Sequence, residues 1–522
     1  MAEEEIETPR VGKHILSTLT CGMYQDPRMI FREYIQNAAD QIDTLPEDER
    51  GDNVRKTIRI EIDEKAKRVE ITDQATGIPK NLFLERLLNV ADSHKDPSKN
   101  KGFRGIGRLA GLSYCQKLIF ESSAIGETGV SRLELDGYKL TKILHDVEDR
   151  SLAGDVMKKI SKYSFEKDAS RDYVCFFKVT LEEVRVDVGK SLLDVDSVRE
   201  FIAQVAPVPF SRVKFHAHKK IEEAAQEAGV VIEEYTVQVN GATVTKPYKD
   251  VVCDAQGRTL GEVGEPFFKK FEWHKRLLAW GWFILPTQGV SLPESQNPER
   301  KIRLRKGNIQ IGFSDFLDPY FPEARSNGYM LGEIHLVSDG ILPNGDRNAL
   351  EVSEESSAFV EMLKMRCFKD LWNSAHKANE LKNAIKAVDA YEDVQRQIDK
   401  ATREGNFVVA ESLQDDLESA YEKAVVGQQK LKKAGTTPGK GEFVKGVVDV
   451  LTAESEGKAA PLVKPAAVVI KATPKKTVKP VTVVEQDRVN VIVKVLRDEG
   501  FEVMQAFELA KKIDEKLSST EE

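Results

Sequence analysis

The fold is decided by residues 26–41, which read DPRMIFREYIQNAADQ. Asp26 suits the N-cap of a helix and Pro27 suits its first helical position, whereas Pro46 cannot continue one. The stretch therefore predicts a helix that begins at Asp26 and ends before the later proline.

One face of this predicted helix carries polar side chains. Glu33, Asn37 and Asp40 are spaced by four and then three residues, so they share a face. That face holds a base, an amide that can bind a metal, and a second carboxylate. The alternative is an amphipathic surface helix, whose buried stripe would comprise Ile30, Tyr34, Ile35, Ala38 and Ile42.

The composition is that of a soluble globular protein with several domains. The chain has 522 residues, 41% hydrophobic and 31% charged, and a domain usually takes about 100–200 residues. No segment is long and apolar enough to span a membrane, and the acidic first residues cannot form a secretory signal, so we expect a cytoplasmic protein. The net charge of −8 gives no global case for nucleic-acid binding, although a local basic patch stays open.

The cysteines argue against a disulfide framework and a zinc site. There are 5 of them, far apart in sequence and never arranged as Cys-x-x-Cys. We expect most of them to be small buried hydrophobes: Cys21, Cys115, Cys175, Cys253 and Cys367.

Two strand patterns follow the first helix. Residues 56–63 and 68–73 alternate apolar and polar side chains, which predicts a hairpin with one buried face. The second strand ends at Asp73, in a loop that also contains Gly77. A helix is expected from about residue 79 to residue 90.

A polar segment then leads into a glycine turn, in which Gly102, Gly105 and Gly107 form a Gly-x-x-Gly-x-Gly pattern. Such a turn lets backbone N–H groups approach phosphates, and a helix that begins there adds its positive dipole end. The preceding residues 91–101 are suited to a lid. The pattern is neither a P-loop nor a dinucleotide fingerprint, because it lacks Gly-Lys-Ser/Thr and follows a lysine-rich loop instead of a strand.

The polar helix, the Asp73 loop and the glycine turn, in this order, resemble the ATP-binding domain of the GHKL family. Gyrase, the ninety-kilodalton heat-shock chaperone, histidine kinases and MutL share that domain. The resemblance implies a Bergerat-type α/β sandwich, a mixed sheet covered on one face by helices, with nucleotide held between helices and lid. It also implies ATP and Mg²⁺ as cofactors.

The resemblance assigns roles to single residues. Glu33 would be the general base that activates water, and Asn37 would bind the magnesium ion that bridges the phosphates. Asp73 would accept a hydrogen bond from the adenine amino group, and Gly77 would let the backbone approach the base. The remaining nucleotide contacts fall to Asp40, Ser93, Lys95, Gly102, Arg104, Gly105, Ile106, Gly107 and Thr180.

Two positions depart from the family pattern. Ala75 stands where the Asp-x-Gly-x-Gly motif has glycine, which restricts the backbone of that loop. Thr180 takes the role of a late Gly-Thr pair that has no clear equivalent here. Glu33 separates the chain from histidine kinases, which lack this glutamate, and His14 is the only histidine before the domain.

After the ATP-binding domain, expected at residues 1–185, residues 186–375 predict a mixed α/β middle domain of the transducer-like kind. Residues 301–311 alternate charged and apolar side chains, and we expect their cations on a solvated sheet face in preference to a phosphate site. An aromatic cluster is predicted to build a core: Trp273, Trp280, Trp282 and Phe283.

Residues 332–351 resemble the middle-domain segment of the heat-shock chaperone that carries an arginine to the γ-phosphate. Arg347 is the matching residue. A planar guanidinium with several donors suits the charge that develops on transferring phosphoryl oxygens. The alternative is a surface arginine that caps a turn.

The last third of the chain predicts three parts. Residues 376–433 form a helical hairpin or short coiled coil with a break at 404–407, similar to the paired-helix motif of the UvrB and UvrC repair proteins. Residues 434–484 are a disordered linker rich in Lys, Pro, Ala and Val. Residues 485–522 form a small helical module for docking or dimerisation.

The resemblance implies an α+β ATPase that converts ATP to ADP and phosphate, closest to the heat-shock chaperone, acting as a nucleotide-gated clamp in a homodimer. One hypothesis is a chaperone-like remodeller of protein clients, favoured by the Arg347 segment and the acidic net charge. A second is a MutL-like or microrchidia-like clamp on nucleic acid, in DNA maintenance or phage defence, favoured by the lysine-rich linker and the repair-like hairpin. A third is an ATP-sensing scaffold.

Overall fold

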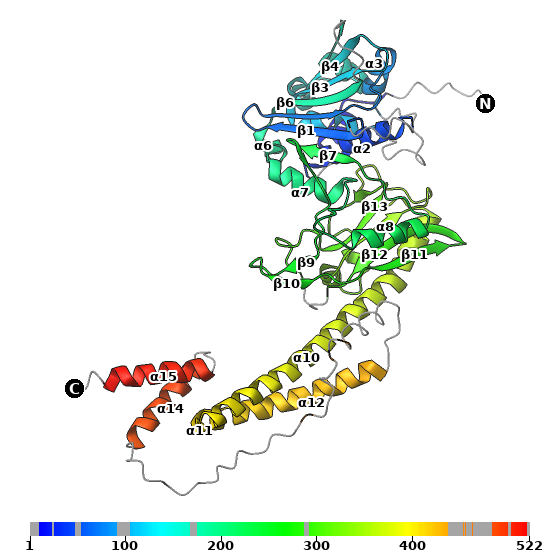
Figure 1. Cartoon of the computed structure of the whole chain (residues 1–522). Helices are drawn as coiled ribbons and strands as arrows, with labels where there is room; N and C mark the ends of the chain where they lie inside the picture. The colour runs from blue at the N-terminus through cyan, green and yellow to red at the C-terminus, as the bar shows by residue number, and fades with distance from the viewer. Residues whose placement is uncertain are drawn as a thin grey trace. The chain divides into compact units, whose positions relative to one another are not determined.

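The computed structural model describes residues 10–22, 26–46, 54–90, 105–167, 175–286 and 292–436, and further on residues 453, 455, 462, 483–498 and 503–518. The chain divides into two compact units, Met1–Trp372 and Asn373–Glu522. Figure 1 traces them from the N-terminus to the C-terminus. Sheets and helices in the first unit and helices in the second agree with the expected α+β class.

The first unit opens with an eight-stranded sheet in the order β5-β4-β3-β6-β2-β1-β7-β8. The β1–β7 pair is parallel and the other pairs are antiparallel, so the sheet is mixed. The expected hairpin is confirmed as β1 and β2. The strands are β1 Thr57–Asp63, β2 Arg68–Asp73, β3 Cys115–Ser123, β4 Gly129–Asp136, β5 Ser161–Lys167, β6 Phe176–Val184, β7 Thr236–Val239 and β8 Ala242–Thr243.

Helices cover one face of this sheet, as the alternation of buried residues along β2 and β4 indicates. Their apolar side chains join those of the strands in one core, which includes Ile30, Ile71 and Phe83. The helical elements are α1 His14–Ser17, η1 Thr18–Gly22, α2 Met29–Asp43, α3 Lys80–Leu88, η3 Gly107–Ser113, α4 Gly137–His145, α5 Ala153–Ile160, α6 Val186–Gly189, η4 Lys190–Leu192 and α7 Val195–Val205.

The start of α2 corrects the sequence prediction. Regular helix begins at Met29, and Asp26 lies in the turn before it, where its Oδ1 accepts the backbone N–H of Arg28 at 2.9 Å. The carboxylate therefore caps this turn and not the helix itself. The surface-helix alternative is also wrong, because polar residues on α2 are buried together with its apolar stripe: Arg32, Glu33, Gln36 and Asp40.

A second sheet has the order β11-β12-β15-β13-β14, beside a separate β9–β10 pair. Trp280 and Trp282 are buried in its core, as expected, together with Phe210, Phe215 and Tyr248. The elements are α8 His218–Glu227, β9 Val251–Cys253, β10 Thr259–Glu262, β11 Phe267–Trp273, β12 Arg276–Ile284, β13 Lys301–Lys306, β14 Ile309–Ile311, η5 Asp318–Tyr320, η6 Ala324–Tyr329, β15 Leu331–Leu336, α9 Glu354–Met362 and η7 Leu363–Cys367.

Two expectations for residues 186–375 need correction. β7 and β8 pair within the first sheet, so that sheet extends beyond the boundary expected at residue 185. The expected solvated face of residues 301–311 is also wrong, because Arg303 and Arg305 are only 4% and 1% exposed. Nε of Arg305 pairs with the carboxylate of Glu333 at 2.6 Å, and Nη2 of Arg303 donates to the carbonyl of Pro298 at 2.9 Å.

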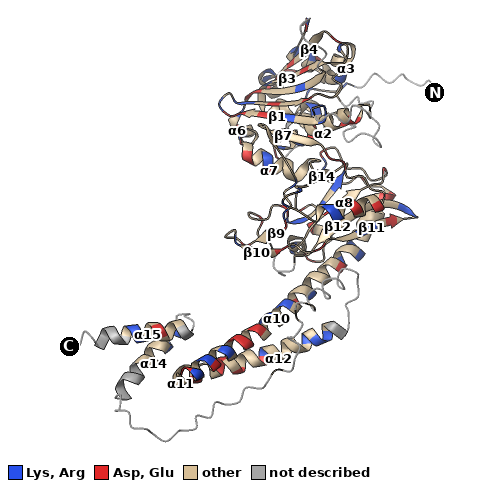
Figure 2. Cartoon of the chain, viewed as in Figure 1, with Lys and Arg blue, Asp and Glu red and all other residues tan. Residues whose placement is uncertain are grey.

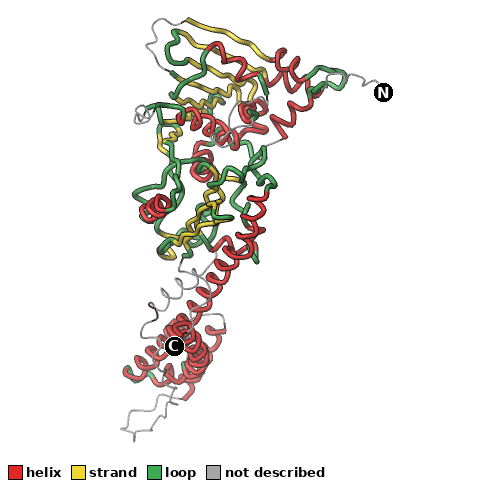
Figure 3. The backbone as a smooth tube through the Cα atoms, turned by 90° about the vertical axis from the view of Figure 1, so that its right-hand side faces the viewer, coloured by secondary structure: helices red, strands yellow, loops and turns green. Residues whose placement is uncertain are grey.

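The second unit is built from helices, as Figure 3 shows. The expected hairpin consists of α10 Phe368–Arg403, which begins in the first unit, followed by α11 Phe407–Ser412 and α12 Gln414–Thr436. The chain turns at Gly405, whose φ is +75°, and Gly427 packs closely on the backbone of Ala384. Figure 2 shows acidic and basic residues mixed along α10 and α12. Two more helices, α14 Val483–Asp498 and α15 Val503–Ser518, pair through a small apolar core in the predicted terminal module.

Most of the predicted linker at 434–484 lies outside the described residues. No described helix is both long enough and apolar enough to span a bilayer. Cys115 and Cys367 are buried as expected, whereas Cys175 and Cys253 are half-buried. The side chain of Cys21 is among those not described.

Candidate active site

Glu33 lies buried on α2, held by the residue next to it. Its Oε1 accepts hydrogen bonds from Nε and Nη2 of Arg32, at 3.2 and 3.0 Å. Arg32 is 1% exposed, and its Nη2 also donates to the carbonyl oxygen of Asp346 at 3.0 Å. One guanidinium therefore connects the carboxylate of Glu33 to a loop more than 300 residues later in the chain.

The glycine turn lies against the other oxygen of Glu33. A Cβ at Gly107 would be 2.4 Å from Oε2 of Glu33, so only glycine leaves room for the carboxylate in its present place. Gly105 has a φ of +69°, a left-handed conformation that favours glycine. Two residues of the glycine pattern are thus explained by the shape of the site.

Tyr34 fixes the distance between α2 and this turn. Its hydroxyl donates to the carbonyl of Arg108 at 3.1 Å and accepts the N–H of Gly111 at 3.0 Å. Burial raises the pKa of this phenol, which stays protonated and can serve in both bonds. The helix expected after the turn is present as a short 3-10 helix, η3.

Asp73 is a buried carboxylate at the end of β2, 2% exposed. Its Oδ1 accepts the N–H of Ala75 at 3.1 Å, and no cation pairs with it among the described residues. Burial raises its pKa to about 7, and the Ala75 hydrogen bond offsets only part of that rise. A buried carboxylate with one hydrogen bond and no described cationic partner suits a neutral hydrogen-bond donor, such as the amino group of a base.

Gly77 is held tightly beside this carboxylate. Its φ is +64°, and a Cβ there would lie 2.2 Å from the carbonyl oxygen of Ser123. The next amide, of Ile78, donates to Oγ of Ser122 at 2.7 Å, which fixes the loop to β3. Ala75 is fully buried without a left-handed φ, so the glycine of the usual motif is not required at that position.

The other polar residues of α2 differ in exposure. Asn37 is half-buried and lies one helical turn from Glu33, whereas Asp40 is 1% exposed. Among the described residues, no cluster of three or more His, Cys, Asp or Glu could hold a metal ion. An amide fits Mg²⁺ all the same, because this ion keeps several waters and takes its other ligands from phosphates.

Thr180 is not brought to this site. It lies opposite Glu70 in the β2–β6 register, whereas Phe177 lies opposite Asp73. Side chains alternate along a strand, so Thr180 and Asp73 are on opposite faces of the sheet. Four further predicted contacts lie outside the described residues: Ser93, Lys95, Gly102 and Arg104. Ile106 is half-buried and directly precedes η3.

Arg347 lies in the turn that Arg32 reaches. It is 6% exposed with a φ of +56°, and its carbonyl oxygen accepts the N–H of Gly312 at 2.7 Å. Its burial excludes the surface-arginine alternative. The carbonyl of Asp346 joins this turn to the Arg32–Glu33 pair.

Sequence reasoning missed three parts of this arrangement: Arg32, Tyr34 and the Asp346 carbonyl. The one signal for Arg32 was its position next to Glu33, which on a helix normally points a side chain elsewhere. The position of Tyr34 in the sequence indicates only a member of the apolar stripe. A backbone carbonyl leaves no trace in the sequence.

Comparison with known proteins supports the nature of this site. Residues 33–166 match the family model described as "Histidine kinase-, DNA gyrase B-, and HSP90-like ATPase". The match begins at Glu33 and includes Asp73, Gly77 and the glycine turn. No curated protein sequence matches the chain. The match supports a GHKL-type ATPase domain over residues 33–166, and such a domain implies ATP binding.

Proposed function

We propose that the protein hydrolyses ATP and that Glu33 is the general base. The observation that carries this proposal is the position of its carboxylate, between the Arg32 guanidinium on Oε1 and Gly107 on Oε2. Because Oε1 accepts both Arg32 bonds, Oε2 is the oxygen that would take the proton of an attacking water. It faces the turn that would hold the phosphates.

Residues of β2, of the loop after it and of α2 would hold the nucleotide. Asp73 would accept a hydrogen bond from the adenine amino group, and Gly77 would let the backbone lie against the base. Asn37 would hold Mg²⁺, which, when bound, offsets the charge of the phosphates. Support comes from the burial of Asp73, the backbone contact at Gly77 and the partial exposure of Asn37.

Arg347 would stabilise charge on the transferring phosphoryl group. Support comes from Asp346, whose carbonyl is hydrogen bonded to the Arg32 side chain that holds Glu33. Movement of Arg32 away from Glu33 would free the base and would disturb the Arg347 turn at the same time. A guanidinium is suited to this role because its charge persists when it is buried.

Nucleotide would open and close a clamp, made by a homodimer, that remodels protein clients in the manner of the heat-shock chaperone. Support comes from the sequence around Arg347 and the net charge of −8. A clamp on nucleic acid is favoured by lysines that no acid opposes between residues 458 and 479: Lys458, Lys464, Lys471, Lys475, Lys476 and Lys479. Stimulation of turnover by DNA that fades as salt rises would select the nucleic-acid clamp.

The decisive experiment measures ATP binding and ATP turnover separately. Glu33→Ala should bind ATP and lose turnover, while Asp73→Asn should lose binding. Glu61→Ala, at an exposed position on β1, is the matched control and should behave as wild type. Equal turnover by Glu33→Ala and wild type would contradict the role of Glu33 as the base. If Glu33→Ala lost turnover but kept the biological function of the protein, the ATP-sensing scaffold would be favoured.

A further inference from the structure

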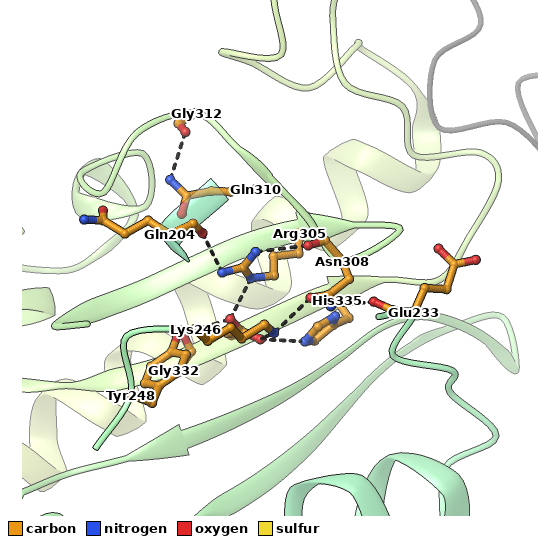
Figure 4. Close-up of polar contacts among 11 residues, drawn as sticks. Gln204, Glu233, Lys246, Tyr248, Arg305, Asn308, Gln310, Gly312, Gly332 and His335 are labelled. Atoms are coloured by element: carbon orange, nitrogen blue, oxygen red, sulfur yellow. Dashed lines mark hydrogen bonds and ion pairs between the residues drawn. The ribbon is translucent and has the colours of Figure 1, made fainter. Parts of the chain in front are cut away.

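A buried ion cluster lies in the second sheet, away from Glu33. The carboxylate of Glu333, fully buried, pairs with Nζ of Lys246 and Nε of Arg305, both at 2.6 Å. Nε2 of His335 lies 3.2 Å from the same carboxylate. Figure 4 shows how the side chains of Lys246, Arg305 and His335 converge.

The negative charge of Glu333 is strongly held, whereas burial lowers the pKa of Lys246 to about 8 and also lowers that of His335. Burial alone would raise the pKa of Glu333, but Arg305, Lys246 and His335 hold it well below its usual range. Because an ion pair inside a protein is costly to separate, the groups bonded to this cluster have little freedom to move.

Two residues of the cluster, Arg305 and Asn308, donate hydrogen bonds to backbone carbonyls outside the second sheet. Nη2 of Arg305 donates to the carbonyl of Gln204, at the C-terminal end of α7, at 2.7 Å. Asn308, which accepts a hydrogen bond from Lys246, donates to the carbonyl of Glu233 just before β7 at 2.6 Å. The second sheet is thereby tied to α7 and to the chain that enters the first sheet.

The other end of α7 contacts the start of α2. Nη1 of Arg28 donates to Oγ of Ser197 at 2.9 Å, and its guanidinium lies 5.1 Å from the ring centroid of Phe201. Arg28 directly precedes α2, the helix that carries Glu33. α7 is therefore a rigid connection between the ion cluster and the catalytic helix.

A second connection leaves from the same hairpin. Arg305 lies opposite Gln310 in the β13–β14 register, and β14 leads directly to Gly312. The N–H of Gly312 donates to the carbonyl of Arg347, and the neighbouring carbonyl of Asp346 accepts from Arg32. Both connections thus run from the Arg305 hairpin to α2.

On the basis of the ATP site proposed above, we propose that Arg305 is a positioning residue that couples the second sheet to the catalytic helix through α7 and the Arg347 turn. A nucleotide-driven shift of α2 then reaches β13, β14 and β15 as a unit. A cluster that only stabilises the second sheet would not transmit it.

The chain offers a matched pair of variants for the test. Arg305→Met removes both the ion pair and the Gln204 contact, while Glu333 keeps Lys246, His335 and Tyr248 as partners, so we expect it to fold. Arg303→Met removes a buried arginine from the same strand, whose Nη2 donates to the carbonyl of Pro298, near β13 itself. Arg28→Met, at a half-buried position, interrupts the α7 route at its far end should Arg305→Met not fold.

Hydrogen exchange of the full chain is measured with and without a non-hydrolysable ATP analogue and Mg²⁺, alongside ATP turnover. In wild type and Arg303→Met, we expect the analogue to slow exchange in β2 and η3 and also in β13–β15. In Arg305→Met, protection should remain in β2 and η3 and disappear from β13–β15. The kcat of Arg305→Met should fall about tenfold, a typical loss of coupling between sites, while its Kd for the analogue stays unchanged. Arg28→Met should show the same pattern in part.

The exchange patterns of the variants and of wild type can each overturn the inference. If Arg305→Met transmits protection to β13–β15 as well as Arg303→Met does, or if both variants lose it equally, Arg305 has no special role in coupling. Transmission in Arg28→Met as complete as in Arg303→Met would likewise remove α7 from the route. If the analogue does not slow hydrogen exchange in β2 and η3 of wild type, the ATP site itself is overturned, and the coupling proposal with it.

Discussion

Two buried glutamates in the first unit have opposite surroundings. Glu33 has one described cationic partner, Arg32, and one of its oxygens lies against a glycine. Glu333 is enclosed by Lys246 and Arg305, with His335 beside it. A carboxylate with one cationic partner can change its bonds, whereas one with several buried partners is fixed. The surroundings of Glu33 suit a catalytic base, and those of Glu333 suit a fixed connection between structural elements.

The largest expected effect comes from removing the charge of Glu33 alone. Glu33→Gln keeps the shape of the side chain but cannot accept a proton, so turnover should fall by about 10²–10⁴-fold, the usual contribution of a positioned general base. ATP affinity should change little. Single-turnover kinetics beside equilibrium binding checks this, and a loss of affinity equal to the loss of turnover would assign Glu33 to binding instead.

The same substitution at Glu333 should act mainly on stability. Glu333→Gln leaves the cations Lys246 and Arg305 buried without their counter-charge, which costs about 3–5 kcal/mol of unfolding free energy. Urea unfolding followed by tryptophan fluorescence reports on this region and not on the first sheet. None of the 4 tryptophans precedes Trp273, which lies in β11.

Glu272→Gln, at an exposed position on β11, is the control for Glu333→Gln and should leave the unfolding midpoint unchanged. An unchanged midpoint in Glu333→Gln would mean that the buried ion pairs contribute no net stability, and the contrast between the two glutamates would disappear.

The sequence predicts the parts of the site that depend on local spacing. The shared face of Glu33 and Asn37 follows from helical periodicity, and the position of Asp73 at a strand end follows from alternation. Gly77 could be singled out because a turn beside a strand demands a residue without a side chain.

What depends on distant partners could not be predicted in the same way. Arg303 and Arg305 alternate with apolar residues exactly as an exposed strand would, and only the pairing of β13 with β15 brings Arg305 to Glu333. The parallel pairing of β7 with β1 is equally non-local. For Thr180, the face of the strand depends on the register with β2, which the sequence of β6 alone does not set.

A third buried carboxylate, Asp73, has no described cation, and it should make stability depend on pH. Its folded-state pKa of about 7 lies above the ordinary value of 3.8, so the folded state binds the extra proton between these values. The stability that this proton confers is full below about pH 4 and is lost as the pH rises through about 7, up to about 4 kcal/mol in all.

Asp73→Asn cannot ionise and should not show this loss, so the nucleotide-free variant should be more stable than wild type at pH 8 and similar at low pH. Calorimetric unfolding between pH 5 and pH 8 measures the difference, with Asp63→Asn, at the exposed end of β1, as control. Parallel pH profiles for wild type and Asp73→Asn would mean that Asp73 is already ionised in the folded protein at pH 5.

The smallest expected effects come from the glycines beside the two glutamates, and they test the contrast directly. A Cβ at Gly107 would meet the Glu33 carboxylate, the far end of a side chain that can rotate away. A Cβ at Gly332 would lie 2.4 Å from the backbone carbonyl of Trp282, which cannot. Gly332→Ala should therefore destabilise the second sheet by about 1–3 kcal/mol, as overpacking does.

Gly107→Ala should cost less stability than Gly332→Ala but displace the catalytic carboxylate, so that turnover falls while the urea midpoint stays near that of wild type. Chemical denaturation and steady-state ATPase assays on both variants check the pair. If Gly107→Ala proves the more destabilising of the two, Glu33 is held as rigidly as Glu333, and the freedom on which its role as a base depends is lost.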